Sequence, residues 1–214
     1  MTTPPRPALA IPASLAAGLI VGWLTFVLQG ILPDAFNQLA NSGAVWCVIG
    51  FAAGAVGTIG RELGRRGMLA AALFGAVALF GEVIGYYGST TLFLGDDVSA
   101  AALRGPAVWL VVACVAGPVF GIAGLAYRAG RGRVRHLGMG ALGAVFLAEG
   151  LYLAIVLGYW AEAAILGTLG LLVPVVLGRS WSERLRGLGA LVPLIVVGAL
   201  AELGVYLLTR AAFR

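Results

Sequence analysis

Long apolar stretches separated by short polar segments repeat along the whole chain. Seven of these stretches come close to the roughly 20 apolar residues that a helix needs to cross a bilayer core. They cover residues 8–31, 42–59, 68–90, 106–128, 138–160, 163–178 and 188–209, the sixth being the shortest. The alternation typical of strands is absent, and only helices or closed barrels pair their backbone polar groups in lipid. The pattern predicts an all-α membrane protein, a seven-transmembrane-helix bundle that forms a single domain over residues 1–214.

Arginine is concentrated in alternate polar segments. Eleven arginines precede the first span or lie at 60–67, 128–137 and 179–187: Arg6, Arg61, Arg65, Arg66, Arg128, Arg131, Arg133, Arg135, Arg179, Arg184 and Arg186. The other side has only Arg104, Arg210 and Arg214. The positive-inside rule then predicts a cytoplasmic N-terminus and an external C-terminus. This rule accounts for the basic loops, so we expect membrane lipid and no nucleic acid as a partner.

The composition supports a lipid environment. The chain is 61% hydrophobic and 11% charged, whereas soluble domains are about half apolar and a quarter charged. The first apolar stretch has no small-residue cleavage site, so we interpret it as a retained helix of a protein in a bacterial-type inner (cytoplasmic) membrane. Cys47 and Cys114 fall inside spans and are expected to be small buried hydrophobes. The only histidine, His136, lies in a basic segment, and we expect no metal and no cofactor.

Three acidic residues lie inside predicted spans: Glu82, Glu149 and Glu202. An ionised carboxylate at bilayer depth is costly, and an apolar environment favours the neutral acid. Each acid follows an arginine of the basic side by 14 to 16 residues, which places it about 20–24 Å from that side. The three spans run in the same direction. We therefore expect the three acids to converge on one chamber.

A common pattern, E-x-x-x-Y-x-x-[ST], surrounds two of the acids. It comprises Glu82, Tyr86 and Ser89 in the third span, and Glu202, Tyr206 and Thr209 in the seventh. Offsets of four and seven put these polar side chains on one helix face. Glu149 differs, because Tyr152 follows it at three residues. The pattern indicates a weak internal repeat of spans 2–3, 4–5 and 6–7; the alternative is that the acids only hydrogen-bond between helices.

Aromatic and polar residues near the outer span ends have two interpretations. Trp46, Trp109 and Trp160 fit an aromatic belt at the membrane interface or the lining of an outer chamber. Trp23 and Phe146 fit packing, with lining as the alternative. A last group, Gln29, Asn37, Gln38 and Asn41, reads as a solvated turn or as part of a site.

Two kinds of chemistry use buried acids beside aromatics in a small bundle. One is proton-coupled transport, in which acids relay protons. The other is acid-initiated catalysis on a lipophilic substrate, in which a neutral carboxylic acid donates a proton. Aromatic faces then stabilise the carbocation, and a dry chamber protects it from water.

The length, the seven spans and the intramembrane acids resemble the small membrane-bound terpene cyclases. The similarity is to the bacterial indole sesquiterpene cyclases of the drimentine and xiamycin pathways, and it covers the whole chain in outline. It implies a lipophilic substrate from the bilayer, a prenylated (farnesyl) indole whose alkene or epoxide is protonated to trigger ring closure. The catalytic acids would be Glu82, Glu149 and Glu202, although the fungal relatives pair a Glu with an Asp and no Asp lies in a span here.

The same resemblance implies a substrate-binding set drawn from the aromatic residues above: Tyr86, Tyr152, Tyr206, Trp46, Trp109, Phe146 and Trp23. The alternative function is a small proton-coupled transporter that uses the intramembrane Glu residues. Against it, the sequence predicts no inverted repeat and no broken helix pair. The exact substrate, the first acid, the oligomeric state and the direction in which the chamber opens stay open at this stage.

Overall fold

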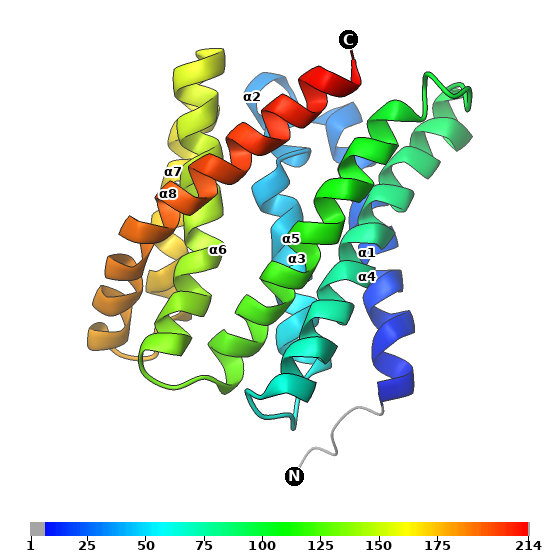
Figure 1. Cartoon of the computed structure of the whole chain (residues 1–214). Coiled ribbons are helices and arrows are strands. Elements are labelled where there is room, and N and C mark those ends of the chain that lie inside the picture. Colours follow the sequence, from blue (N-terminus) through cyan, green and yellow to red (C-terminus); the bar gives the residue numbers. More distant parts are fainter. Residues whose placement is uncertain (1–6, 214) are drawn as a thin grey trace.

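A computed structural model describes residues 7–213, and every regular element in this range is helical (Figure 1). The elements are α1 (Pro7–Ile31), α2 (Asp34–Ala40), α3 (Gly43–Gly57), α4 (Arg65–Ser89), the π-helical turn η1 (Thr90–Leu94), α5 (Arg104–Ala129), α6 (Arg133–Tyr152), the π-helical turn η2 (Leu153–Leu157), α7 (Trp160–Leu177) and α8 (Trp181–Ala212). Seven segments of this range are long and apolar enough to cross a membrane. The predicted all-helical fold with seven spans is confirmed, while Arg6 and Arg214 lie outside the described residues.

The helix ends differ from the predicted spans in informative ways. The membrane-length segment Phe36–Gly57 is a broken helix, because α2 ends at Ala40 and α3 begins at Gly43, close to the predicted start of the second span at residue 42. The sequence had not predicted the short helix α2 before this span. On the basic side, the helices start earlier than expected. His136, expected in a loop, is buried in the first turns of α6, and Cys114, expected to be buried, is exposed on α5.

The last helix is too long to stand upright in a bilayer. Helix α8 has 32 residues, which correspond to about 48 Å at 1.5 Å per residue, against a hydrocarbon core of about 30 Å. It runs diagonally across α5 and α6, as Figure 1 shows. Its span is also the least buried of the seven, so α8 forms an outer wall of the bundle.

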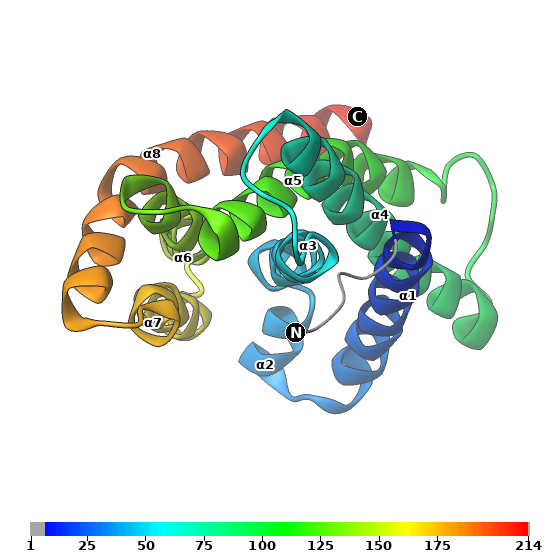
Figure 2. The same ribbon diagram turned by 90° about the horizontal axis from the view of Figure 1, so that it is seen from below.

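The bundle has two groups of helices. In the first, α4 packs between α1 and α5, and α3 packs against both α4 and α5. In the second, α6 packs against α7 and α8 (Figure 2). The two groups meet where α6 contacts α5 and α3. A buried core formed by Phe51, Phe120, Leu142, Phe146 and Leu166, with neighbours on the same helices, fills much of this junction.

Glycine allows α1 and α4 to approach closely. A Cβ added to Gly18 would lie 2.0 Å from the backbone oxygen of Ala78, and one added to Gly22 would lie 2.1 Å from the backbone oxygen of Glu82. Neither distance is possible for a real side chain, so both positions require glycine. Such contacts between small residues are typical of membrane helices, whose association depends on close packing.

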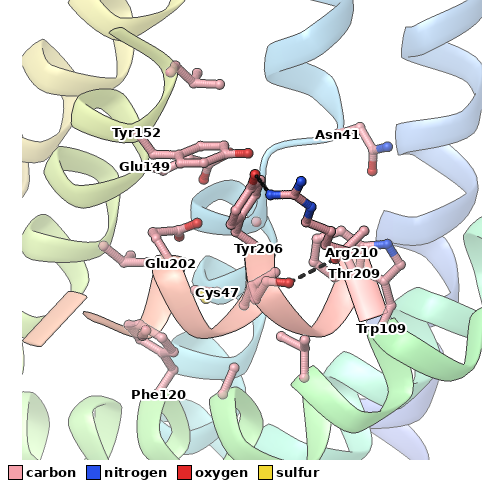
Figure 3. A pocket seen from close by; sticks show the side chains of 17 residues that line it. Asn41, Cys47, Trp109, Phe120, Glu149, Tyr152, Glu202, Tyr206, Thr209 and Arg210 are labelled. Atoms are coloured by element: carbon pink, nitrogen blue, oxygen red, sulfur yellow. Dashed lines mark hydrogen bonds between the residues drawn. The ribbon is translucent and has the colours of Figure 1, made fainter. Parts of the chain in front are cut away.

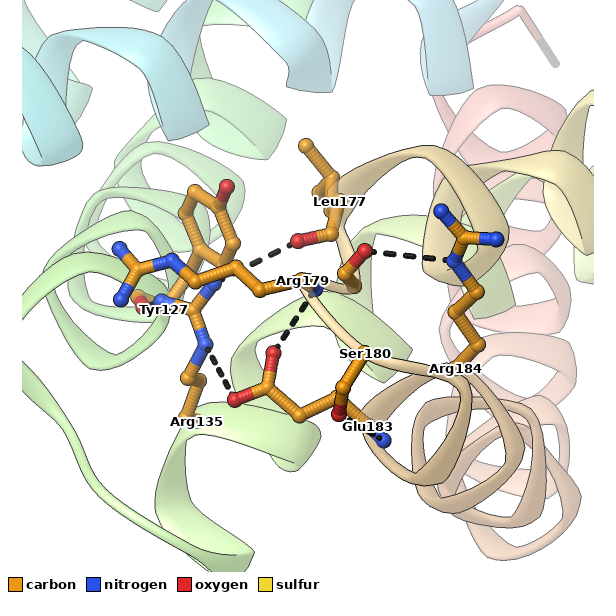
Figure 4. Close-up of polar contacts among 8 residues, drawn as sticks. Tyr127, Arg135, Leu177, Arg179, Ser180, Glu183 and Arg184 are labelled. Carbon is orange, nitrogen blue, oxygen red and sulfur yellow. Dashed lines mark hydrogen bonds and ion pairs between the residues drawn. The ribbon is translucent and has the colours of Figure 1, made fainter.

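Arginine side chains fasten the end of the bundle that carries the basic loops. Arg128 donates to the backbone oxygens of Thr58, at 2.5 Å, and Arg61, at 2.9 Å, beyond the end of α3. Arg135 is buried, donates to the backbone oxygen of Tyr127, and lies 3.5 Å from the Glu183 carboxylate (Figure 4). Cations suit helix C-termini, where backbone oxygens lack intrahelical partners.

The opposite end of the bundle has a different recurring feature. Both α4 and α6 continue into a π-helical turn, and each turn ends at a left-handed glycine, Gly95 with φ 71° and Gly158 with φ 75°. Isolated π turns in membrane-length helices often mark functional regions. The third and fifth spans, which the predicted repeat treats as equivalent, therefore share this ending, whereas the E-x-x-x-Y-x-x-[ST] motif had matched the third span with the seventh.

Candidate functional site

A cavity of about 500 Å³ lies between α3, α5, α6 and α8, toward the end opposite the basic loops (Figure 3). Its apolar wall includes Val112, Ala116, Phe120, Val145, Leu153, Ala201 and Val205. Its polar side chains are Asn41, Glu149, Tyr152, Glu202, Tyr206, Thr209 and Arg210. This volume, with a mainly apolar lining and a few convergent polar groups, is characteristic of small-molecule sites.

Glu149 is held rigidly by the broken helix. Its carboxylate Oε2 accepts a hydrogen bond from the Ser42 hydroxyl at 2.8 Å and another from the backbone N–H of Ala44 at 2.6 Å. Ser42 is the N-cap of α3, and its oxygen also accepts from the Val45 N–H at 3.3 Å. A carboxylate at a helix N-terminus is favourable, because free N–H groups and the positive end of the helix dipole face it. The break between α2 and α3 therefore exposes the hydrogen-bond donors that bind the Glu149 carboxylate.

Glu202 has a different environment. It comes from the outer helix α8, is partly buried, and makes no hydrogen bond to any other group in the described part of the chain. Its neighbours in the cavity wall include Ala201 and Val205. A carboxyl group in apolar surroundings without hydrogen-bond donors is favoured in its neutral form. The two acids of one cavity thus differ: Glu149 has two donors that suit a carboxylate, and Glu202 has none.

Two tyrosines and an arginine form the mouth of the cavity. The rings of Tyr152 on α6 and Tyr206 on α8 lie 6.3 Å apart between centroids. Arg210 donates to the Tyr206 hydroxyl at 3.1 Å and its guanidinium lies 6.0 Å from the centre of that ring. Figure 3 shows both tyrosines and both acids directed toward the same space. Aromatic faces at this spacing suit a cation inside the cavity.

Five of the ten predicted site residues line this cavity: Glu149, Glu202, Tyr152, Tyr206 and Trp109. The other five do not: Glu82, Tyr86, Trp46, Phe146 and Trp23. The prediction that all three acids share one chamber is therefore wrong for Glu82.

Glu82 lies at the predicted depth but on another face. It is fully buried on α4, where α1 crosses at Gly22, and neither of its carboxyl oxygens has a hydrogen-bond partner among the described residues. Counting residues gives the height of a side chain in the bundle, whereas its direction depends on the rotation of the helix. Because α4 is packed by α1, α3 and α5, a residue on α4 can be buried at the level of the cavity without lining it.

The four aromatic residues outside the cavity have structural environments. Trp46 packs in a buried cluster, with its ring 5.8 Å from Tyr86 and 6.0 Å from Trp109. Phe146 belongs to the core between the two helix groups. Trp23 is 46% exposed on the outer surface of α1. Trp160, at the start of α7, is 70% exposed, as an aromatic belt residue would be.

Sequence reasoning missed several residues of the site. Ser42 and Phe120 were not singled out, and Arg210 was noted only for its charge, yet Ser42 holds Glu149 and the other two line the cavity. Asn41 also lines it, although its cluster read as a solvated turn. One signal was available for Ser42: serine before a glycine- and alanine-rich apolar run is a typical N-cap. Phe120 had no distinguishing pattern.

The described residues include no group of three or more His, Cys, Asp or Glu side chains suited to a metal ion. Comparisons with curated proteins and with solved structures gave no match. The model of one protein family, described as a family of unknown function (DUF6518), matches residues 1–211. Since this match covers nearly the whole chain, the protein belongs to the DUF6518 family.

Proposed function

We propose that this protein is a membrane-bound terpene cyclase that acts on a prenylated indole. The observation that carries the proposal is the pairing of two unlike carboxyl groups, Glu149 and Glu202, in one mainly apolar cavity beside Tyr152 and Tyr206. Pairs of titratable groups in unlike environments are typical of acid–base catalysis. The cavity volume of about 500 Å³ falls within the range of small-molecule sites.

In the proposed reaction, Glu202 is the initiating acid. Its O–H bond breaks as the proton forms a C–H bond at the terminal alkene of the farnesyl chain, which leaves a tertiary carbocation. The next alkene attacks this carbon and closes a ring, while the faces of Tyr152 and Tyr206 stabilise the moving positive charge. Loss of a proton to the Glu149 carboxylate restores a double bond or the indole ring. The product is an isomer of the substrate, and no cofactor is consumed.

The orientation proposed for the bundle fits this chemistry. With the basic loops in the cytoplasm of a bacterial-type inner membrane, the cavity lies in the outer half of the bilayer. A farnesyl chain partitions into the bilayer, so the substrate is present at the depth of the cavity. The apolar wall keeps bulk water away from the cation, which would otherwise be quenched to an alcohol.

Glutamine substitutions test the proposal. Glu202→Gln keeps the shape of the side chain but removes the acidic proton, and general acid catalysis contributes roughly 10²–10⁴-fold to rate. Membranes that contain the wild type should cyclise farnesyl-indole, and Glu202→Gln should lose activity by that factor. Glu149→Gln should also lose activity, because glutamine cannot accept the final proton.

Glu82→Gln is the matched control, because Glu82 is equally an intramembrane acid but lies outside the cavity. It should keep cyclisation close to the wild-type rate. Near wild-type activity in folded Glu202→Gln and Glu149→Gln would refute the acid assignment, and so would a complete loss confined to Glu82→Gln.

The alternative is proton-coupled transport, and two observations favour it. One is the broken helix at α2 and α3, since discontinuous helices form the binding sites of many transporters. The other is the unpaired carboxyl of Glu82, a possible second protonatable station. However, Phe51, Ala123 and Leu142 of the buried core lie between the cavity and the basic loops. Proteoliposomes that move protons with a solute gradient, without forming any cyclised product, would support transport.

A further inference from the structure

A second hollow adjoins the cavity and faces the bilayer. It has a volume of about 450 Å³ and lies between α5, α6 and α8. Val111, Val115 and Val119 form its edge on α5, spaced by four residues so that they share one helix face. They are 54%, 65% and 52% exposed. Because these residues lie in a membrane-spanning segment, the groove opens to lipid.

The groove and the cavity are continuous. Both are lined by Ala116, Phe120, Val145, Ala201 and Val205, and also by Glu202. Glu202 is the only charged or polar side chain among the residues that line the groove. The carboxyl group that we assign as the initiating acid therefore lies where the apolar, lipid-facing groove meets the cavity.

From this junction we infer that the groove is the lateral passage for the prenyl chain of the substrate, which reaches Glu202 from the bilayer with its terminal alkene leading. The inference rests on the cyclase function proposed above. Apart from Phe120 and Glu202, the lining is aliphatic; it offers little to a polar solute or a head group, whereas it matches a linear isoprenoid. A phospholipid acyl chain would fit the same lining, but it has no group that Glu202 can protonate.

A glycine in the groove wall offers a place to block the passage. Gly204 on α8 lines the groove, and a Cβ added there would meet no atom within 4 Å. A phenylalanine at this position would extend into the groove without a backbone clash. Gly189 is a matched control on the same helix, because it also has open space around it and lines neither hollow.

The test uses a farnesyl-indole analogue with a diazirine on its middle isoprene unit, in proteoliposomes. On illumination, the wild type and Gly189→Phe should be labelled near Val115 and Gly204. Excess unlabelled farnesyl-indole should reduce this labelling at least tenfold. Labelling at Val176 on α7, which is 75% exposed and lies outside both hollows, should not change, because it reports contact with bulk lipid. Gly204→Phe should lose the competable labelling, and the KM for farnesyl-indole should rise at least tenfold.

The outcomes separate this inference from the function on which it rests. Cyclisation together with groove labelling that farnesyl-indole does not displace, or that survives in folded Gly204→Phe, would overturn the passage and leave the cyclase proposal standing. In that case the groove holds a bilayer lipid. Competable groove labelling without any cyclised product would support the passage as an isoprenoid site and refute the cyclase function.

Discussion

The two ends of this bundle treat buried charge in opposite ways. At the basic end, Arg128 and Arg135 donate to backbone oxygens near the ends of α3 and α5, and Arg135 also pairs with Glu183. At the other end, α5, α6 and α8 enclose a cavity whose carboxyl groups are only partly matched: Glu149 has donors, and Glu202 has none. At the basic end, the charged side chains hold neighbouring helices together through these contacts. In the cavity, the carboxyl group of Glu202 has no partner among the described residues.

This difference is informative because buried polar groups without partners are costly. A buried group that loses its hydrogen bond costs about 1–3 kcal/mol, and ionisable groups inside membranes usually mark functional sites. Arg128 and Arg135 find partners nearby, although the Nε of Arg128 has none among the described residues. The partly buried Glu202 accepts no hydrogen bond from the described residues, and the fully buried Glu82, outside the cavity, has none either. Charged side chains therefore stabilise the basic end, whereas the chemistry that we propose takes place at the cavity.

The largest expected difference between the two ends is their accessibility to a reagent added outside the cell. Asp96 lies in the exposed segment that follows η1, and Arg131 lies in the turn between α5 and α6 at the opposite end. In a background with Cys47→Ala and Cys114→Ala, an impermeant maleimide added outside intact cells should label Asp96→Cys and spare Arg131→Cys. The reverse labelling, or equal labelling of both, would refute the proposed orientation.

The next largest effect concerns the fastening at the basic end. Arg135→Gln removes the partner of the partly exposed Glu183 and one donor to the backbone oxygen of Tyr127, and a hydrogen bond to a charged group contributes about 1.5–3 kcal/mol. We expect a loss of this size in the free energy of unfolding in detergent, with little change in the kcat of folded protein. Arg133→Gln is the control, because Arg133 is exposed. Equal stability of the two variants would show that the Arg135 contacts do not fasten the bundle.

A smaller effect is expected at the hydrogen bonds of Glu149. Ser42→Ala removes the hydroxyl donor to Glu149 and the N-cap of α3, and one such hydrogen bond contributes about 1 kcal/mol. We expect kcat to fall roughly five- to tenfold, with KM unchanged, and Ser42→Thr to recover most of the rate. Equal changes in kcat and KM, or no rescue by threonine, would indicate that Ser42 serves only the fold.

Many of the features that distinguish the two ends were predictable from the sequence, because they depend on composition and on the position of a residue along the helix axis. Apolar run length predicts the number of spans, and the arginine distribution predicts which loops share an end. Residue counting also brings Glu149 and Glu202 to one level, and they do share a cavity. Each of these properties is one-dimensional along the helix axis, so it can be read from the order of residues.

The remaining features depend on how helices turn and tilt against one another. Glu82 shares the level of the other acids but lies on a face of α4 crossed by α1. The break before Gly43 lies at the polar residues Asn41 and Ser42, but its partner Glu149 comes from a helix more than 100 residues away. The tilt of α8 across α5 and α6 is likewise a matter of packing between helices. No local pattern encodes these relations.

The most direct test of the central claim is cyclisation of farnesyl-indole in D₂O. If a carboxylic acid starts the reaction by protonating the terminal alkene, that acid exchanges with solvent between turnovers and delivers one deuterium to carbon in each product molecule. Mass spectrometry should find one non-exchangeable deuterium in the product of the wild type, at the carbon of the former terminal alkene, and almost no product from Glu202→Gln. A cyclised product without carbon-bound deuterium, or full deuterium transfer by folded Glu202→Gln, would contradict the account.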